Sequence, residues 1–238
     1  MCNEAARRTA LGLMREDFSQ VGIELTFPDG APNLGEAPSI RITDTTVIVR
    51  AAGDAVEMVQ WRWSWVGAQG KPVYNYRSEG RAFGNAVPGE RGGGRCLIPL
   101  DGFYEFTDAG PGAKRKDKWL FSLQEPSDSN FSESGPECPS RELTTPRPAT
   151  PNGEARAAPG LFCVAGLWRA DVDLGKGMRG EAFTMLTCEP GPDIAPYHSR
   201  QIVLMPRDRW ADWLGGTVPA ADLIAPTPAG TLRVAPAR

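Results

Sequence analysis

The sequence predicts one globular domain built mainly of short β-strands, with a few helices. Runs 45–51 and 55–65 are rich in β-branched and aromatic residues and are separated by Gly53-Asp54, which predicts a hairpin. Apolar runs of the same kind occur between residues 96 and 106 and again between 161 and 188. We therefore expect a mostly β architecture in both halves of the chain.

A polar insertion separates these two halves. Residues 125–160 are dominated by Pro, Ser, Thr, Gly and Glu, so they cannot bury enough apolar surface to offset the entropy of ordering, and we expect them to be disordered. The tail from residue 217 is rich in Ala and Pro and is expected to be irregular, with a last strand near 232–234. Because 238 residues with 41% apolar content suit one core, we predict a single domain over 1–238.

The amino-terminal segment is predicted to be helical. Leu11, Met14 and Phe18 recur at helical spacing, which favours a helix over residues 3–20. Cys2 would then lie at the N-terminal end of this helix, where the helix dipole favours a thiolate.

Composition excludes several function classes. The net charge of −3 gives no global nucleic-acid signature, so any such binding needs a local basic groove. Five widely spaced cysteines and one histidine make a zinc site or a disulfide framework unlikely, and we expect no metal and no cofactor. No run approaches transmembrane length and residues 1–20 contain no secretory signal, so we expect no membrane association and a cytoplasmic location. A reducing cytoplasm would keep Cys2 as a thiol.

Cys2 directly follows the initiator methionine. Because its side chain is small, we expect Met1 to be removed by an aminopeptidase, which leaves an amine and a thiol on one residue. Such a 1,2-aminothiol condenses with an aldehyde to an imine, and its thiol then closes a five-membered thiazolidine. An α-amine titrates near ~7.8, so a useful fraction is neutral at physiological pH. A chance cysteine on a frayed end is the alternative.

Aromatic and basic residues offer candidate DNA contacts. Trp61, Trp63 and Trp65 share one face of a strand, which fits a core face or a platform for bases. The glycine-rich stretch 80–94 together with Arg95 fits a basic loop or a solvated one. The basic cluster at 114–118 is interpreted as a solvated turn.

Glu105 stands between Tyr104 and Phe106 in a predicted strand. Its side chain therefore points away from both rings, towards either water or a polar cavity. Periodicity does not decide between the two.

Four separated motifs carry a resemblance to a known family. They are Met1-Cys2 at the start, Asn-Tyr-Arg-Ser-Glu at 75–79, Gly-Arg-Cys-Leu-Ile-Pro-Leu-Asp-Gly-Phe-Tyr-Glu-Phe at 94–106, and His-Ser-Arg at 198–200. They are similar to the N-x-R-x-E, R-C-L-I-P-x-x-G-F-Y-E-W and H-x-R motifs of the SRAP family (SOS response-associated peptidase). Residues 162–168 resemble its F-A-G-L-W strand, so the resemblance covers the chain except the insertion and the tail.

The resemblance implies an α+β fold, with a predominantly antiparallel, barrel-like β core and a few peripheral helices. It also implies recognition of abasic sites in single-stranded DNA through a thiazolidine crosslink to the ring-opened sugar. By position, Cys2 would be the nucleophile, Asn75 would hydrogen-bond near its amine, Glu105 would transfer protons, and His198 would assist sugar opening. Arg77 would bind phosphate.

We expect further DNA contacts, and the chain departs from the family at its start. Arg81 and Arg95 would add to a basic groove, and Trp65 or Tyr74 would wedge beside the abasic site. The family usually begins Cys-Gly-Arg, whereas this chain has Cys-Asn-Glu, a change expected to lower DNA affinity.

Three function classes follow. The first is a monomeric DNA–protein crosslinker at abasic sites that acts in the DNA damage (SOS) response, with lyase-like chemistry, in the cytoplasm or nucleoid, or in the nucleus if eukaryotic. The second is a thiol peptidase or amidohydrolase, including self-removal of Met1, in which Cys2 and His198 act as nucleophile and base. The third is a non-catalytic binder of single-stranded DNA.

Overall fold

The computed structural model describes residues 2–80, 83, 92–108, 115–124 and 160–237. Of the insertion predicted to be disordered at 125–160, residues 125–159 lie outside the described residues. Among the described residues, no helix combines the length and the apolar character needed to cross a membrane.

Five strands pair in a closed ring and form a barrel. They are β4 (Thr45–Ala52), β5 (Ala55–Trp63), β13 (Met178–Cys188), β12 (Phe162–Gly175) and β9 (Gly93–Leu100). Antiparallel pairings join β13 to β12, β12 to β9, β9 to β4 and β4 to β5, and a short parallel pairing of β13 with β5 closes the ring. The predicted hairpin and the predicted barrel-like α+β fold are confirmed.

Short strands extend the barrel sheet. They are β2 (Leu25–Thr26), β8 (Asn75–Arg77), β14 (Gln201–Ile202) and β15 (Leu204–Met205), while β6 (Trp65–Val66) and β7 (Pro72–Val73) form a separate ribbon. Of these, β8 runs parallel to β13 and pairs Asn75 with Met185. This pairing places the 75–79 motif beside the end of a barrel strand.

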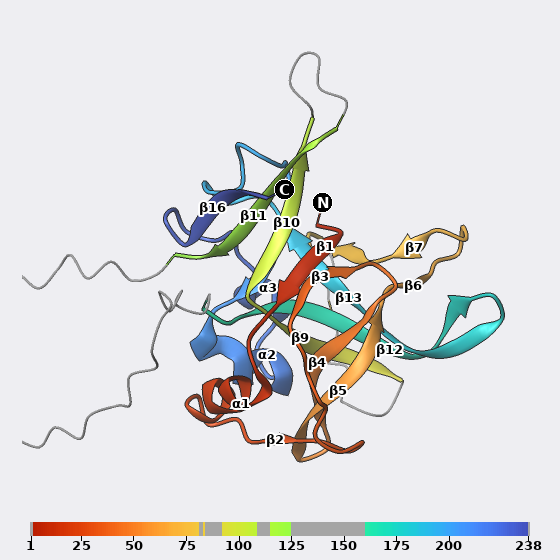
Figure 1. Ribbon diagram of the computed structural model, residues 1–238. Helices are drawn as coiled ribbons and strands as arrows, with labels where there is room; N and C mark the ends of the chain where they lie inside the picture. Colours follow the sequence, from red (N-terminus) through yellow and green to blue (C-terminus); the bar gives the residue numbers. More distant parts are fainter. Residues whose placement is uncertain (1, 81–82, 84–91, 109–114, 125–159, 238) are drawn as a thin grey trace, which may run out of the picture.

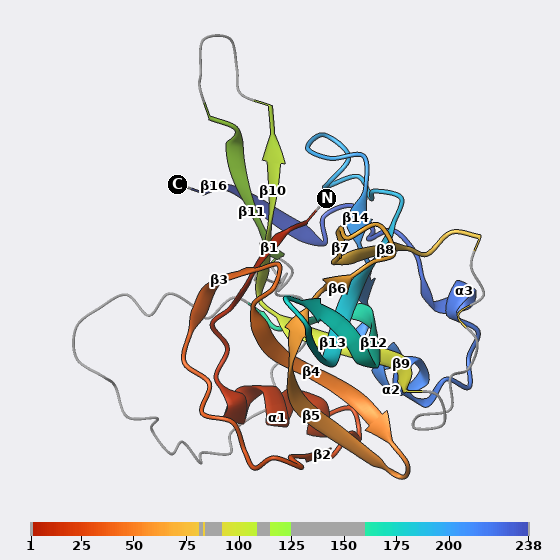
Figure 2. The ribbon, with the colours of Figure 1, turned by 90° about the vertical axis from the view of Figure 1, so that its right-hand side faces the viewer.

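A second sheet packs against the barrel. Its strand order is β16 (Leu232–Ala237), β11 (Asp117–Leu123), β10 (Gly102–Thr107), β1 (Glu4–Arg7) and β3 (Ala37–Arg41). In Figures 1 and 2, β10 and β11 extend beyond the barrel on the side where the amino terminus lies. Because β1 pairs with β10 on one side and β3 on the other, the residues that follow Cys2 form an inner strand of this sheet.

Both faces of the barrel strands are buried, which explains their nearly continuous apolar runs. In β9, Cys96 and Ile98 belong to the core shared with the second sheet, whereas Leu97 belongs to the core under the helices. The interior is tightly packed at Gly166, where an added Cβ would lie 2.5 Å from Ile98 Cδ1 and 2.7 Å from the Thr184 carbonyl oxygen. This crowding accounts for glycine in the F-A-G-L-W-like strand.

The helices cover the other face of the barrel. They are α1 (Leu11–Ser19), α2 (Trp210–Gly215), α3 (Ala220–Leu223) and the 3-10 turn η1 (Arg207–Arg209). Met14 and Phe18 of α1 pack with Trp210 and Trp213 of α2, all fully or almost fully buried. In Figure 1, α1 and α2 lie on the side of the molecule away from the β10–β11 extension.

Two sequence predictions need correction here. The helix predicted over 3–20 begins only at Leu11, because residues 4–7 pair as β1 between β10 and β3. The tail, expected to be irregular from residue 217 apart from a last strand near 232–234, also contains the helix α3, and its strand extends over Leu232–Ala237 as β16, paired with β11 along its whole length. At the amino terminus, pairing with distant strands determines a structure that local sequence does not show.

Candidate active site

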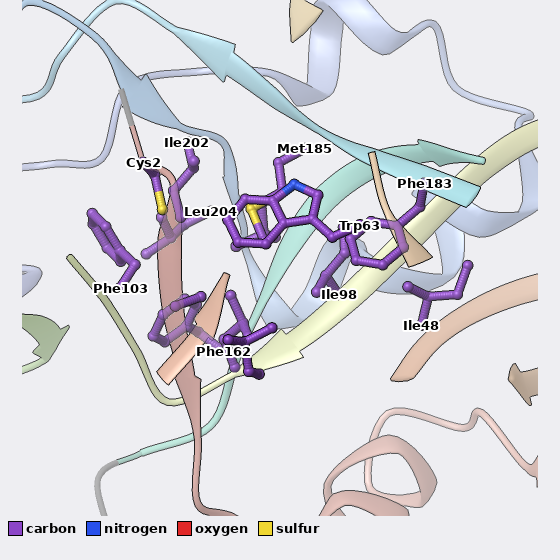
Figure 3. Close-up of a cluster of buried hydrophobic side chains, with 14 of the residues drawn as sticks. Cys2, Ile48, Trp63, Ile98, Phe103, Phe162, Phe183, Met185, Ile202 and Leu204 are labelled. Carbon is purple, nitrogen blue, oxygen red and sulfur yellow. The ribbon is translucent and has the colours of Figure 1, made fainter. Parts of the chain in front are cut away.

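Cys2 lies immediately before β1 and is held against the end of β10. The register pairs Glu4 with Tyr104 and Ala5 with Phe103. The thiol is buried, with 1% of the residue exposed, and Sγ donates a hydrogen bond of 3.3 Å to the Glu4 carbonyl oxygen. Figure 3 shows Cys2 at the edge of the apolar cluster that also contains Phe103 and Ile202. Cys2 is thus a fixed residue and not part of a frayed terminus.

The environment of the thiol opposes ionisation. Burial raises the pKa of the Cys2 thiol far above its ordinary value, and the nearby Glu105 carboxylate raises it further. The expectation of a thiolate favoured by a helix dipole is therefore wrong, because Cys2 precedes a strand and not a helix. The thiol is held neutral until something in the reaction removes its proton.

Asn75 reaches Cys2 from β8. Its side-chain Nδ2 donates a hydrogen bond of 2.7 Å to the Cys2 carbonyl oxygen. The strand that carries Asn75 is fixed by its parallel pairing with β13 and by the bond from the Met185 amide to the Tyr74 carbonyl. The amide of Asn75 consequently sets the position of the Cys2 main chain.

Glu105 contacts Cys2 from another strand, β10. The Cys2 backbone N–H donates a hydrogen bond to its carboxylate. Burial leaves 2% of the residue exposed and raises the pKa of Glu105 to about 7, although the positive amino terminus and the Cys2 amide act to lower it. A carboxyl group with this pKa can both accept and return a proton near neutral pH.

His198 follows the turns after β13. Its Nδ1 lies 3.0 Å from the Arg200 backbone N–H, which donates to it, and 3.1 Å from the Arg200 carbonyl oxygen. Nδ1 accepts from the Arg200 amide in one tautomer of the ring and donates to the Arg200 carbonyl oxygen in the other, so Arg200 holds the ring in either case. Burial, followed by the positive amino terminus, lowers the pKa of His198 below its ordinary value. The ring is therefore mostly neutral at physiological pH.

A cleft of about 480 Å³ joins these groups. Its lining residues are Asn3, Tyr74, Glu105, Phe106, Lys116 and His198. Cys2 lies beside this cleft through its contact with Glu105, and Asn75 holds Cys2 from behind. The structure thus brings together the four residues that the sequence indicated for catalysis, although Cys2 and His198 are almost 200 positions apart.

The residues expected to bind DNA differ in their exposure and in whether they line the cleft. Arg77 is exposed on β8, two positions after Asn75, and Tyr74 lines the cleft. Trp65 is buried, with the Arg169 guanidinium 5.3 Å from its ring centre, and does not line the cleft. Of the two candidate wedge residues, only Tyr74 reaches the cleft.

The two remaining arginines do not contribute to this cleft as described. Arg95 is buried in β9, where it donates to the Val218 carbonyl oxygen at 2.9 Å and lies over the Trp213 ring. Its guanidinium is thus used inside the helix-covered side of the barrel. Arg81 lies outside the described residues.

The tryptophan face of β5 belongs to the core. Trp63 is fully buried and its Nε1 donates to the Tyr74 carbonyl oxygen at 2.9 Å. Trp61 is half-buried and its ring centre lies 5.1 Å from that of Trp168. Of the two interpretations of this face, the structure favours packing over a platform for bases.

Glu4, where the family usually has arginine, is an internal residue. Its carboxylate accepts hydrogen bonds of 2.7 Å from Lys118 Nζ and from Ser39 Oγ. Burial acts to raise the pKa of Glu4, but these bonds lower it overall. Glu4 is therefore ionised and neutralised by Lys118, and it presents no free negative charge to a ligand.

Asn3, Phe106 and Lys116 line the cleft although the sequence did not indicate them as site residues. The Lys116 side chain is 64% exposed, and its Nζ lies 3.2 Å from Asp108 Oδ1, where β10 ends and β11 begins. The sequence pattern predicts a solvated turn for the basic cluster at 114–118. The signal that could have identified Lys116 is the hairpin itself, because β11 pairs with the strand of Glu105, with Trp119 opposite Glu105, and the basic cluster comes directly before that position.

No group of three or more His, Cys, Asp and Glu side chains suited to a metal ion occurs within the described residues. The four described cysteines, at positions 2, 96, 163 and 188, are all buried and free.

Comparisons with known proteins bear on the fold and on the family. Two solved structures resemble the chain across its whole length: a protein from Bacteroides thetaiotaomicron (13% identity, TM-score 0.63, 92% of that chain covered) and a phage-related protein from Bordetella bronchiseptica (17% identity, TM-score 0.61, 94% covered). These likenesses support the fold. No curated protein matches the sequence. The SRAP family, described as SOS response associated peptidase, matches residues 1–238, and the chain belongs to this family.

Proposed function

We propose that this protein crosslinks itself to abasic sites in single-stranded DNA, through a thiazolidine formed by Cys2 after removal of Met1. The observation that carries the proposal is the position of the Cys2 backbone nitrogen. That atom donates to Glu105 and belongs to a residue whose carbonyl group is held by Asn75. Once Met1 is removed, the same nitrogen is the α-amine, already beside an acid–base group.

The first step is opening of the sugar. An abasic deoxyribose is mostly a closed hemiacetal and reacts only as its ring-opened aldehyde. Opening needs a proton removed from the C1 hydroxyl and a proton given to the ring oxygen. Glu105 and His198 line the cleft that would hold the sugar, and the pKa of Glu105, raised to about 7, suits proton transfer.

The second step joins amine and aldehyde. The neutral Cys2 amine adds to C1, and the carbinolamine loses its hydroxyl group as water to give an iminium ion. Glu105 can take the proton from the amine and supply one to the departing hydroxyl group. A pKa near 7 lets the same group act in both directions.

The third step closes the ring. Sγ of Cys2 attacks the iminium carbon and its proton passes to a base, for which Glu105 is the nearest candidate. One C–N and one C–S bond form, and one water molecule leaves overall. The raised pKa of the thiol fits this order, because a neutral buried thiol does not compete with the amine for the aldehyde.

The groups that could bind DNA are a few side chains at the cleft and on β8. Lys116 and Tyr74 line the cleft with a positive charge and an aromatic ring, and Arg77 is exposed two positions after Asn75. The net charge of −3 makes such local contacts necessary. We place the phosphates near these two cations and the abasic sugar beside Glu105 and His198.

A second candidate is peptidase activity, which the family description names. In its narrowest form the protein would remove its own Met1, since the Met1–Cys2 amide nitrogen donates to Glu105. The raised pKa of the thiol disfavours a thiolate nucleophile for this reaction. The intact mass of protein made in a host without methionine aminopeptidase activity tests it, and retention of Met1 argues against self-processing.

The crosslinking proposal is tested with purified protein and single-stranded DNA that contains one abasic site. Wild type should give an adduct that survives denaturation, and Cys2→Ala should give none without a reducing agent. Cys2→Ala still has an α-amine, so borohydride should trap its imine. Binding without any adduct from wild type would favour a non-catalytic DNA binder instead.

A further inference from the structure

An ion pair between Glu79 and Arg200, outside the cleft, connects the motif of Asn75 with the motif of His198. Arg200 donates through both terminal nitrogens to the Glu79 carboxylate, with 2.8 Å between NH2 and Oε2. Glu79 ends the motif that begins with Asn75, and Arg200 ends the motif that begins with His198. The two sequence motifs are thus joined at their far ends.

The pair meets at the end of a barrel strand. Arg200 NH2 also donates to the Thr187 carbonyl oxygen at 2.8 Å and to its Oγ1 at 3.0 Å. The Ser78 backbone amide and hydroxyl donate to the same carbonyl at 3.0 and 2.9 Å. Thr187 therefore fixes both the segment after Asn75 and the segment that carries His198.

Arg200 acts directly on the imidazole. Its backbone N–H donates to His198 Nδ1, and its carbonyl oxygen lies 3.1 Å from the same atom. A rotation of the Arg200 backbone would move the Nδ1 contact and with it the orientation of the ring. The guanidinium contacts with Glu79 and Thr187 restrict that rotation.

The Glu79 end of the pair is open to solvent, which limits what the pair contributes to stability. The side chains of Arg200 and Glu79 are 12% and 43% exposed, and pairs of this kind contribute only about 0–1 kcal/mol. The hydrogen bond from Arg200, which lowers the pKa of Glu79, keeps the carboxylate ionised. The ion pair is ionised and contributes little free energy, so its contacts bear mainly on the geometry of the Arg200 segment.

We infer that the Glu79–Arg200 pair positions His198 for proton transfer in the crosslinking reaction. Glu79 is a positioning residue and does not touch the substrate in this account. The inference rests on the proposed function, because it assigns Glu79 a part in the same reaction. The charged groups around the imidazole are Glu105 and Lys116 in the cleft, the amino terminus, and Arg200 behind the ring.

The experiment compares Glu79→Gln, Glu79→Asp, His198→Ala and the double variant Glu79→Gln/His198→Ala in protein lacking Met1. Glu79→Gln should slow adduct formation at saturating DNA about 10-fold, a part of the ~10²-fold or more that a general acid–base group contributes. The half-saturating DNA concentration should not rise, since a negative charge is removed. Glu79→Asp should recover part of the rate.

The double variant separates positioning from general damage. If Glu79 acts only through His198, adding Glu79→Gln to His198→Ala should change the rate less than 2-fold. Independent effects of the two substitutions would instead multiply, to within about 2-fold. Equal slowing with and without His198 would overturn the inference, as would a wild-type rate for Glu79→Gln. Thermal unfolding of each variant checks that the fold is retained.

A second readout does not depend on DNA. The chain has one histidine, so its imidazole gives one set of ring signals in NMR spectra. Glu79→Gln should shift the ¹⁵N signal of Nδ1, and an unchanged signal would contradict positioning. Absence of any wild-type adduct refutes the proposed function, whereas normal wild-type and slow His198→Ala reactions with an unaffected Glu79→Gln refute only this inference.

Discussion

The side-chain amide of Asn75 donates a 2.7 Å hydrogen bond to the carbonyl oxygen of Cys2. The bond joins a barrel-associated strand to the amino terminus, and Glu105 contacts the nitrogen of the same residue from the second sheet. Cys2 is therefore held at two main-chain atoms by two separate sheets. In an ordinary protein the first residues are free to move, whereas here their position is the basis of the proposed chemistry.

Asn75→Asp should slow adduct formation. Aspartate keeps the size of the side chain but replaces the donor with a carboxylate that repels the Cys2 carbonyl. The rate at saturating DNA should fall about 10-fold, since one neutral hydrogen bond contributes about 1–1.5 kcal/mol. Single-turnover crosslinking measures this, and an Asn75→Asp rate equal to wild type would remove Asn75 from the mechanism.

The reaction should accelerate as pH rises from 6 to 8. Glu105 with a pKa of about 7 becomes a base over this range, and the α-amine loses its proton near ~7.8. Glu105→Gln should be slow throughout and should keep only the amine dependence. Rate profiles of the two proteins test this, and identical profiles would exclude Glu105 as the base.

Glu105→Gln, which should slow the reaction, should stabilise the fold relative to wild type as pH rises. Because the pKa of Glu105 is raised on folding, its ionisation opposes folding, and stability is lost as pH rises from about 4.5 to about 7. Glu105→Gln has no such loss. Its melting temperature relative to wild type should therefore increase between pH 5 and pH 8, and a difference that stays constant would show that Glu105 is not destabilising.

Lys116→Gln should weaken DNA binding without slowing the chemistry. We expect the half-saturating DNA concentration to rise and the slope of log affinity against log salt to fall by about 0.7, the value for one phosphate contact on a single strand. Lys176→Gln is the matched control, because it removes the same charge at the tip of the β12–β13 hairpin, which Figure 1 shows far from the amino terminus. Equal effects of both changes would indicate net charge alone.

Lys118→Met should destabilise the fold by about 2–4 kcal/mol, because it leaves the buried Glu4 carboxylate without its cation. Adding Glu4→Gln to this variant should restore much of the loss. Urea unfolding of the two single variants and the double variant measures this coupling. Additive losses would show that the two residues do not act as a pair.

Much of the fold could be predicted from sequence where local pattern and final structure agree. The β4–β5 hairpin has alternating apolar residues and a Gly53-Asp54 turn, and the helical spacing of Met14 and Phe18 appears in α1. The segment at 4–7 could not be predicted this way, because its Glu, Ala and Arg residues favour a helix locally. Pairing with β10, about 100 positions away, overrides that preference.

The site was predictable as a set of residue types but not as a geometry. The motifs indicated Cys2, Asn75, Glu105 and His198, while only the pairings of β1, β8 and β10 show how the first three meet. Burial of Trp65 and Arg95 depends on contacts with residues more than 100 positions away. Sequence spacing carries no information about such contacts.

The most direct test of the central claim is the intact mass of the adduct between wild-type protein and single-stranded DNA with one abasic site. The account predicts a mass equal to the chain without Met1 plus the DNA minus one water, with the modified carbon located on Cys2 by fragmentation, and it predicts this without borohydride. An adduct located on Lys116, one that retains Met1, or no adduct would contradict a thiazolidine at Cys2.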